Sequence, residues 1–335
     1  MEYRRLGESG IQVSPICLGA MMFGDRTDLA TAQRIADSAL EAGINFIDTA
    51  DGYAKGESER VVGRVVGERR NRWIVATKVH NSMGGGPNNG GLSRRWLLHE
   101  IDASLERLAC DHIDIWYFHR DDRDTPLEET LGAVADIIRA GKVRYFGLSN
   151  FQAWRIAEVT LTCRLLGIAA PIVCQPLYNA VNRMAEAEIL PACAHFGLGV
   201  VSYSPLARGV LTGKYLPGEA PPQDSRAGRR DPRVLEDEYR PESLRLAQQI
   251  KAHAAKRGIS AGQFALGWVL NNARVTSVLA GPRTLEQWRE YLGALDYAFS
   301  AEDEALIDGM VHPGHPSTPG YTDSKFPVIG RVPRR

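Results

Sequence analysis

Eight short apolar runs, each followed by a segment with helical periodicity, constrain the fold of this chain most strongly. Each run has the length of a buried strand, and the segments between them carry apolar residues three and four positions apart. Strands that are separated by helices pair in parallel, because the helical crossover returns the chain to the same edge. The predicted strands are residues 16–20, 45–50, 73–79, 113–119, 143–149, 172–178, 199–205 and 276–281.

The connections from helices to the following strands are short. Gly43, Gly141 and Gly167 each stand at the predicted end of a helix, where glycine readily takes the positive φ of a C-cap. The clearest helix runs from Ser93 to Leu108, and Ser93 is its predicted N-cap. The residues predicted on its buried face are Leu97, Leu98, Ile101, Leu105 and Leu108.

Eight strand–helix couplets favour a closed (β/α)8 TIM barrel of the α/β class over an open sheet. A doubly wound sheet that binds a dinucleotide usually carries Gly-x-Gly-x-x-Gly after its first strand. The nearest match lies in residues 84–91, where Asn89 stands in place of the third glycine. The sequence therefore predicts a barrel without a Rossmann-type phosphate loop.

Three kinds of segment interrupt the couplets. Residues 1–14 alternate polar and apolar around a glycine-containing turn, which predicts a β-hairpin with a positive φ at Gly10. Residues 80–92 and about 207–240 are long loops after predicted strands, so both belong to the C-terminal face of a barrel. The tail 311–335 holds five prolines and three glycines and is predicted to be a loop. No linker is found, so residues 1–335 are predicted to form a single domain.

Composition argues against several classes of partner. Lys+Arg 40 balances Asp+Glu 40 in 335 residues, so no basic face for nucleic acid is predicted. No apolar run approaches the roughly 18 to 20 residues of a membrane helix. Met1 also leads into charged residues and not into a signal-peptide core, so a cytoplasmic protein is predicted. Five cysteines without CxxC spacing are expected to be buried, reduced thiols, and self-association is left open.

Four ionisable side chains stand at or just after the ends of three successive predicted strands. Asp48 and Tyr53 come from the second strand end, Lys78 from the third and His119 from the fourth. Parallel strand ends meet at one face of a barrel, so these groups are expected to lie together. An ammonium stabilises a nearby phenolate, and a carboxylate keeps that ammonium charged and in place. Such a tuned proton donor suits reduction of a carbonyl, whose oxygen gains negative charge, and His119 is expected to hydrogen-bond that oxygen.

The chain resembles the aldo-keto reductase superfamily over nearly its whole length, from Arg5-Leu6-Gly7 to the segment after the eighth strand. Asp48-x4-Tyr53, Lys78 after Ala76-Thr77, and His119 stand where this superfamily keeps its catalytic tetrad. The resemblance implies that these four residues are catalytic. It also implies that the cofactor is NADPH, with NADH as the alternative, bound without a Rossmann fold.

The resemblance further implies which residues hold each part of the cofactor. Ser149, Asn150 and Gln175 match the positions that bind the nicotinamide carboxamide, and Tyr203 matches the aromatic that stacks on the ring. Residues 281–290 resemble the segment that grips a 2'-phosphate, which argues for NADPH. The implied cofactor positions are Met22, Ser149, Asn150, Gln175, Tyr203, Ser204, Leu206, Arg208, Lys214, Gly281, Arg283, Thr284, Gln287 and Glu290.

Two parts of this cofactor pattern are weaker. The family commonly has Asn after the glutamate, and this chain has Tyr291, so the adenine contacts and the NADPH preference depart from the pattern. Arg208 and Lys214 match residues that close over the pyrophosphate, but a solvated basic loop explains them almost as well.

The implied substrate positions are Met21, His80 and Arg120. Relatives that reduce apolar aldehydes often carry aromatic residues at the places of His80 and Arg120. Both are polar here, which favours a hydroxylated or acidic small-molecule carbonyl, such as a sugar-derived aldehyde or a keto-sugar. The alternative is that both side chains face solvent or structural partners.

The sequence thus predicts an NADPH-dependent carbonyl reductase with Tyr53 as proton donor. One alternative is a cofactor-binding regulatory subunit with slow turnover, as in the potassium-channel beta subunits of the same family. Another is a barrel metallohydrolase, which needs several His and carboxylate ligands at suitable spacing. His80 and His119 alone do not supply such a set, so no metal site is predicted.

Overall fold

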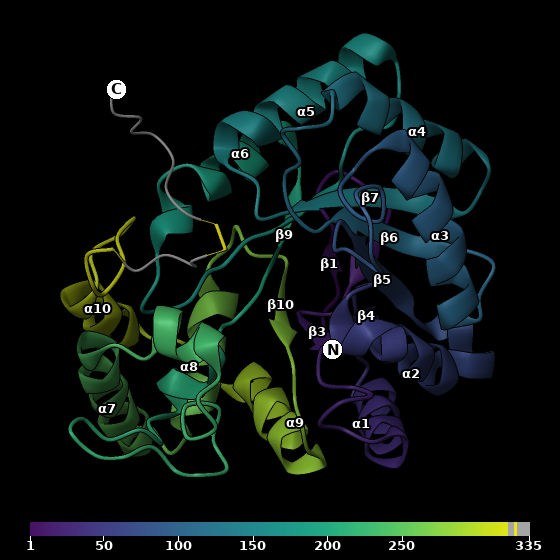
Figure 1. The fold of residues 1–335 in the computed structure, drawn as a ribbon. Helices are drawn as coiled ribbons and strands as arrows, with labels where there is room; N and C mark the ends of the chain where they lie inside the picture. Colours follow the sequence, from purple (N-terminus) through teal and green to yellow (C-terminus); the bar gives the residue numbers. More distant parts are fainter. Residues whose placement is uncertain (321–324, 327–335) are drawn as a thin grey trace. The chain divides into compact units, whose positions relative to one another are not determined.

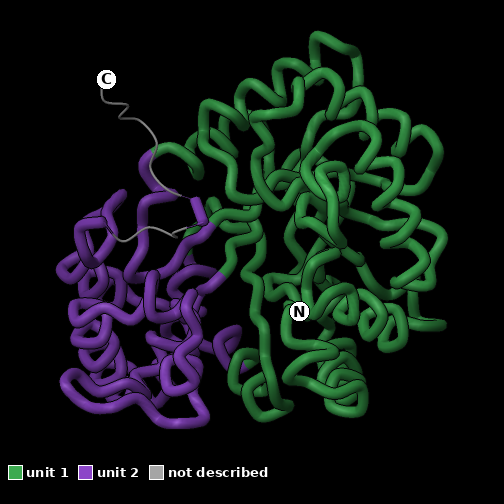
Figure 2. The backbone as a smooth tube through the Cα atoms, viewed as in Figure 1, with its two compact units in different colours: residues 1–176, 188–203, 272–292 green, residues 177–187, 204–271, 293–335 purple. Residues whose placement is uncertain are grey.

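The structure is a computed structural model that describes residues 1–320 and 325–326. The chain divides into two compact units (Figure 2). Unit 1 consists of Met1–Pro176, Glu188–Tyr203 and Asn272–Leu292, and unit 2 consists of Leu177–Ala187, Ser204–Asn271 and Gly293–Arg335. That residues 1–335 act as a single domain stays a prediction.

Unit 1 contains a closed barrel of parallel strands, and this confirms the predicted (β/α)8 class. Each strand pairs with its neighbours in chain order, and the last strand pairs with the first through Val278 opposite Ile16. Each prediction overlaps one observed strand. The barrel strands are β3 (Ile16–Gly19), β4 (Phe46–Asp48), β5 (Ile74–Val79), β6 (Ile113–Phe118), β7 (Val143–Ser149), β8 (Val173–Gln175), β9 (Gly199–Ser202) and β10 (Ser277–Ala280).

Helices alternate with the barrel strands and lie outside them within unit 1 (Figure 1). The helices of unit 1 are α1 (Leu29–Glu41), α2 (Glu57–Val66), α3 (Arg94–Leu108), α4 (Leu127–Arg139), α5 (Ala153–Leu166), α6 (Ile189–Phe196) and α9 (Leu285–Leu292). Those of unit 2 are α7 (Pro241–Lys256), α8 (Ala261–Asn271) and α10 (Ala301–Met310). Gly43, Gly141 and Gly167 follow α1, α4 and α5 with positive φ, as predicted.

Helix α3 shows where the predicted burial was right and where it was wrong. Ser93 caps it, because its hydroxyl accepts the N–H of Trp96 at 3.3 Å. Leu97 and Ile101 are buried, four residues apart on one face. Leu98 was predicted on that face and is instead 38% exposed, since its side chain is rotated about 100° around the helix from that of Leu97.

Two predicted strands end three residues earlier than expected. Strand β8 stops at Gln175, because Pro176 has no backbone N–H to donate to a ladder. Strand β9 stops at Ser202, and Ser204 has a left-handed φ of 57°, which extended backbone cannot accommodate. The chain directly after each of these two strands is therefore a loop.

The long loop 207–240 contains the short helical turns η4 (Ala207–Thr212) and η5 (Val234–Glu238). Further short helical turns lie outside the long loops, namely η1 (Tyr53–Gly56), η2 (Gly67–Arg72), η3 (Met184–Glu186) and η6 (Gly293–Asp296). Residues 80–92 contain no helix or strand, and residues 311–320 form turns with one isolated bridge at Pro316. The rest of the tail prediction, for residues 321–324 and 327–335, lies outside the described residues. All five cysteines are free, and four are buried while Cys110 is half-buried.

A predicted N-terminal hairpin closes one end of the barrel. Strands β1 (Arg4–Arg5) and β2 (Gln12–Val13) pair antiparallel, and Glu8 N–H donates to the carbonyl of Gly197, just before β9, at 2.9 Å. The hairpin thus covers the N-terminal ends of the strands. The opposite, C-terminal end is where barrels of this type carry their active sites. Its apolar side chains complete a buried cluster of Leu6, Val13, Cys17, Phe46, Ala76, Ile115, Tyr117, Val173 and Val201.

The left-handed glycine of this hairpin is Gly7 and not Gly10, so the predicted position was wrong. Gly7 has a φ of 59°, whereas Gly10 has no positive φ. A Cβ on Gly7 would lie 2.4 Å from the carbonyl oxygen of Gly197 and 2.7 Å from that of Ile172. The nearby barrel backbone therefore requires glycine at position 7. The local sequence does not reveal this contact.

We expect Gly7→Ala to lower the free energy of unfolding by at least about 2 kcal/mol, because a Cβ meets rigid backbone at a left-handed φ. Gly10→Ala is the matched control, since a Cβ there has open space, and its effect should stay within about 0.5 kcal/mol. Urea unfolding of both variants measures the difference. Equal stability of the two would contradict this account of the hairpin.

Candidate active site

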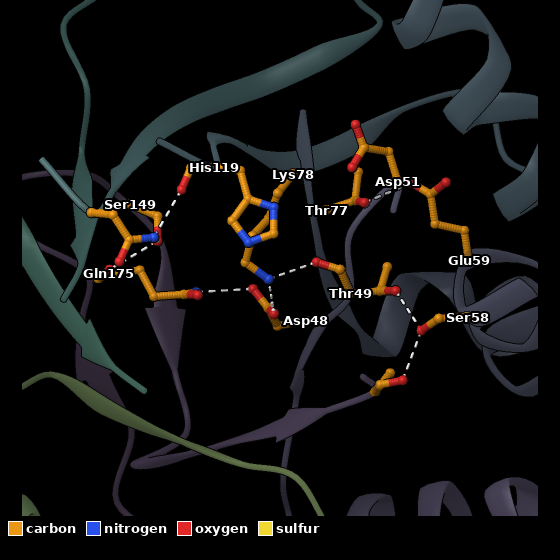
Figure 3. A network of polar contacts seen from close by, with 12 residues as sticks. Asp48, Thr49, Asp51, Ser58, Glu59, Thr77, Lys78, His119, Ser149 and Gln175 are labelled. Atoms are coloured by element: carbon orange, nitrogen blue, oxygen red, sulfur yellow. Dashed lines mark hydrogen bonds and ion pairs between the residues drawn. The ribbon is translucent and has the colours of Figure 1, made fainter. Parts of the chain in front are cut away.

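The predicted tetrad residues Lys78 and Asp48 form a buried ion pair at the C-terminal end of the barrel. Lys78 is 0% exposed, and its ammonium donates to Asp48 Oδ1 and to the carbonyl of Thr49, the latter at 2.7 Å (Figure 3). Gln175 Nε2 donates to the second oxygen of Asp48 at 3.0 Å. Burial alone disfavours an ammonium, but Asp48 and then Tyr53 hold the pKa of Lys78 above its ordinary value. Lys78 is therefore charged at neutral pH.

Tyr53 lies next to this ammonium. Lys78 Nζ is 4.9 Å from the centroid of the Tyr53 ring. The phenol stands at the start of η1, where Ala54 and Lys55 both have left-handed φ angles, 49° and 56°. Consecutive left-handed residues other than glycine are costly and occur mainly where a site requires them. This turn holds Tyr53 over the end of the barrel before α2 begins at Glu57.

His119 completes the group predicted from sequence. It directly follows β6, is half-buried, and contacts Tyr53 edge-on with ring centroids 5.7 Å apart. Its Nδ1 lies 3.2 Å from Asn81 Nδ2, and the same amide nitrogen donates to Asp51 Oδ1 at 3.1 Å. All four predicted catalytic residues therefore gather at one end of the barrel in unit 1.

Behind the site lies a buried acidic cluster that joins α2, α3 and β5. Glu59 accepts from Thr77 and from the Arg107 guanidinium, both at 2.6 Å, and Arg107 also pairs with buried Glu100. Burial, followed by the charges of Glu59 and Glu100, raises the pKa of Asp51 to about 7. The carboxyl group behind Asn81 thus titrates near neutrality.

The cofactor positions predicted on β7, β8 and the loop after β9 lie in hydrogen-bonding distance of each other. Asn150 Nδ2 donates to the Ser149 hydroxyl at 3.1 Å and to the His119 carbonyl at 2.9 Å. Tyr203 donates its hydroxyl to Asn150 Oδ1 at 2.7 Å, and Ser149 donates to the Gln175 carbonyl at 2.9 Å. The structure therefore brings Ser149, Asn150, Gln175 and Tyr203 together beside the tetrad.

Residues predicted for the 2'-phosphate surround the start of α9. Thr284 caps this helix, since its hydroxyl accepts the N–H of Gln287 at 3.3 Å, and Gln287 Oε1 accepts the N–H of Arg283 at 2.8 Å. Burial and the charge of Glu290 raise the pKa of Tyr291 to about 12, against the opposing charge of Arg283. Arg283, Glu290 and Tyr291 therefore share one electrostatic environment.

Two other predicted cofactor positions of unit 1 are less informative. Gly281, exposed, directly follows β10. Met22, half-buried, follows β3, and its carbonyl accepts the N–H of Thr27 at 2.9 Å.

Four predicted cofactor positions belong to unit 2. Leu206 is buried, Lys214 is exposed, and Ser204 accepts from Asn179 Nδ2 through its carbonyl at 3.0 Å. Arg208 lies on η4, and its guanidinium contacts Asp237 at 2.7 Å and Glu238 at 3.4 Å. The Arg208 guanidinium was expected to bind a pyrophosphate and is paired here with these two carboxylates. Its role in pyrophosphate binding stays a prediction.

The predicted substrate residues include one direct pair. Arg120 Nε donates to His80 Nδ1 at 3.0 Å. Burial of His80 and the positive charge of Arg120 lower the pKa of His80 to about 4, so its ring is neutral at physiological pH. Met21 is 36% exposed at the end of β3.

Sequence reasoning missed the residues that support His119 and the barrel wall. Asp51 lies in the same strand-end stretch as Asp48, and this position is the sequence signal for it. Asn81, in the loop after β5, and Arg107, in a helix, carried no local signal. Among the described residues no group of three or more His, Cys, Asp or Glu side chains is arranged to hold a metal ion. Within the same part of the chain, none of the helices is sufficiently long and apolar for a membrane span.

Comparison with known proteins defines the class to which this barrel and site belong. The sequence profile described as Aldo/keto reductase family matches residues 15–312. The chain is 38% identical over 301 residues to a probable voltage-gated potassium channel subunit beta of Oryza sativa subsp. japonica, covering 88% of this chain and 92% of that protein. It is 37% identical over 322 residues to the uncharacterized oxidoreductase YrpG of Bacillus subtilis (strain 168), covering 92% and 96%. It is 36% identical over 329 residues to L-glyceraldehyde 3-phosphate reductase of Escherichia coli (strain K12), covering 94% and 93%.

The chain therefore belongs to the aldo/keto reductase family. It is an oxidoreductase of that family, and the resemblance identified from the tetrad sequence is confirmed.

Asp51 provides a pH-dependent test of this site. In the unfolded chain its pKa is near 3.8, and in the folded protein it is about 7. Between these values the folded state binds the extra proton, so the stability contributed by Asp51 is complete below pH 3.8 and is lost as pH rises to about 7. The loss amounts to about 4 kcal/mol at most.

We expect the free energy of unfolding of Asp51→Asn to fall less steeply than that of the wild type across this window. Urea unfolding at several pH values between about 4 and 8 measures both slopes. Parallel slopes for the two proteins would show that Asp51 has an ordinary pKa.

Proposed function

We propose that this chain reduces an aldehyde or ketone to an alcohol with NADPH, and that Tyr53 donates the proton. The observation that carries the proposal is the charged, buried Lys78 held by Asp48 beside the Tyr53 ring. A buried ammonium stabilises negative charge on a neighbouring phenol oxygen, so the phenol gives up its proton more readily. As the carbonyl carbon is reduced, the proton moves from the Tyr53 hydroxyl to the carbonyl oxygen.

His119 would act on the same oxygen. Its ring lies edge-on to Tyr53, and an imidazole N–H stabilises the charge that grows on a carbonyl oxygen during reduction. Two donors on one oxygen also fix the orientation of the carbonyl. The half-buried positions of Tyr53 and His119 limit the water that competes for these hydrogen bonds.

The residues at the ends of β7 and β8 fit the nicotinamide part of NADPH. Ser149, Asn150 and Gln175 provide the hydroxyl and amide groups that a carboxamide requires, and the Tyr203 ring provides a flat face. When bound there, NADPH supplies the hydride for the carbonyl carbon. The contacts of Gln175 with Asp48 would couple this binding site to the proton donor.

NADPH is proposed over NADH because of the start of α9. Arg283 offers a guanidinium just before the N-terminus of α9, and a guanidinium and the positive end of a helix dipole both favour a phosphate. Tyr291 shares this environment and has the shape to stack on adenine.

The proposed substrate is a polar carbonyl compound, such as a sugar-derived or anionic aldehyde. Arg120 and neutral His80 stand next to the tetrad strands, and Arg120 is exposed and able to pair with an anionic group. The Escherichia coli relative is named as a reductase of a phosphorylated aldehyde, which supports this choice. A cytoplasmic location and self-association stay predictions.

A second candidate function is a cofactor-binding regulatory subunit with slow turnover. It is favoured by the names of the relatives from Oryza sativa subsp. japonica and Arabidopsis thaliana, both probable voltage-gated potassium channel beta subunits. The two candidates differ in turnover, since a regulatory subunit binds NADPH without rapid reduction of any carbonyl in a broad panel.

We expect Tyr53→Phe to lower kcat at least about 100-fold, because only the proton donor is removed. The Kd for NADPH should stay within about twofold, as measured by quenching of tryptophan fluorescence. Tyr3→Phe is the control, since Tyr3 is exposed and its hydroxyl donates to the Gly43 carbonyl at 2.9 Å. Full activity of Tyr53→Phe would remove Tyr53 from the mechanism.

We also expect Arg120→Met to lower kcat/KM at least about tenfold for a phosphorylated aldehyde and to leave that for benzaldehyde nearly unchanged. Arg123→Met, a loss of the same charge nearby, is the matched control. NADPH oxidation across aromatic, hydroxylated and phosphorylated aldehydes measures both variants. An equal loss for all substrates would argue against Arg120 as a substrate contact, and NADPH binding without turnover of any would favour the regulatory subunit.

A further inference from the structure

The side chain of Asn81 lies between a carboxylate and the candidate active-site histidine. Its Nδ2 is 3.1 Å from Asp51 Oδ1 and 3.2 Å from His119 Nδ1. The backbone of Gly52 packs directly on this amide, because a Cβ there would lie 2.8 Å from Asn81 Nδ2. Asn81 is thus enclosed by three parts of the site, although it belongs to a loop.

The carboxylate decides which way the amide of Asn81 is turned. Asp51 accepts the N–H of Gly52 at 2.5 Å and that of His80 at 3.4 Å, so its oxygens face donors on both sides. Above its pKa of about 7, Asp51 is an ionised carboxylate and has no hydrogen to give. The oxygen of Asn81 would be repelled at this position, whereas its NH2 group forms a hydrogen bond.

The amide in turn decides where His119 carries its proton. An amide NH2 group donates two hydrogen bonds and accepts none. The hydrogen that is not donated to Asp51 is directed at His119 Nδ1. Nδ1 must therefore be the lone-pair nitrogen, which leaves the proton on Nε2. In a doubly protonated ring, the N–H at Nδ1 would face the N–H of the Asn81 amide. This repulsion favours the neutral ring.

We propose that Asn81, held by Asp51, is a positioning residue that keeps His119 neutral with its proton on Nε2. This inference rests on the proposed function, in which His119 donates a hydrogen bond to the substrate carbonyl oxygen. The other tautomer would turn a lone pair toward that oxygen and repel the charge that develops on it. Asn81 contacts His119 directly, so we infer that it acts on the reaction through that ring.

The direct test is nitrogen NMR of the full-length protein labelled with 15N-histidine, without cofactor or substrate. At about pH 8, above the pKa of Asp51, the His119 ring should show a proton on Nε2 and none on Nδ1. The His119 signals are assigned by their loss in His119→Asn. A wild-type ring with its proton on Nδ1 would overturn the proposal.

Two variants then separate positioning from a purely structural role. Asn81→Asp replaces the donor with an acceptor, so the proton should move to Nδ1 or the ring should become doubly protonated. Asn81→Ala removes the donor without adding charge, and a mixture of both tautomers is expected. Asn88→Asp, in the same loop and exposed, makes the same change away from His119 and should leave the wild-type signals.

Kinetics show whether the tautomer matters to the reaction. Both Asn81 variants should lower kcat at least about tenfold, with the Kd for NADPH nearly unchanged. An unchanged His119 tautomer in both variants would contradict the proposal even if activity fell, because such a loss would be structural. Failure of the proposed function is recognised separately. If His119 does not hydrogen-bond the carbonyl oxygen, His119→Asn retains full turnover whatever tautomer the NMR shows.

Discussion

The buried ion pair of Lys78 and Asp48 is the interaction on which this site depends. Removing two charges from water costs several kcal/mol for each ion, and their mutual attraction offsets this only when further hydrogen bonds satisfy both groups. The Thr49 carbonyl and Gln175 amide supply those bonds. A buried ion pair is weak evidence for stability, because apolar replacements are often as stable. We therefore propose that this pair is retained for the charge it presents to Tyr53.

The barrel creates this arrangement because parallel strands deliver their last residues to one end. Asp48, Lys78 and Gln175 come from β4, β5 and β8, strands that are far apart in sequence. The N-terminal hairpin fills the opposite end, so polar groups concentrate where the strands stop. Behind them, Glu59 and Arg107 tie the surrounding helices to β5. The strand ends that close the core therefore also bring together the polar side chains beside Tyr53.

The sequence predicted the repeated strand–helix pattern and the tetrad because both depend on local periodicity and strand ends. Leu98 and Gly7 show what local patterns miss, since one depends on helix rotation against the barrel and the other on the approach of distant backbone. Asn81 was missed for a related reason. Its partners, Asp51 and His119, come from different strand ends, and loop conformation alone brings the amide between them. Family resemblance, not periodicity, pointed to the cofactor residues.

The central claim is that the ion pair serves proton transfer at Tyr53 and not the stability of the barrel. The most direct measurement is kcat/KM for carbonyl reduction by the double variant Lys78→Met, Asp48→Asn, together with its urea unfolding. Because no unpaired buried charge remains, the account predicts a folded protein of nearly wild-type stability. It also predicts turnover lower by at least about 100-fold. Wild-type turnover by this folded variant would contradict the account.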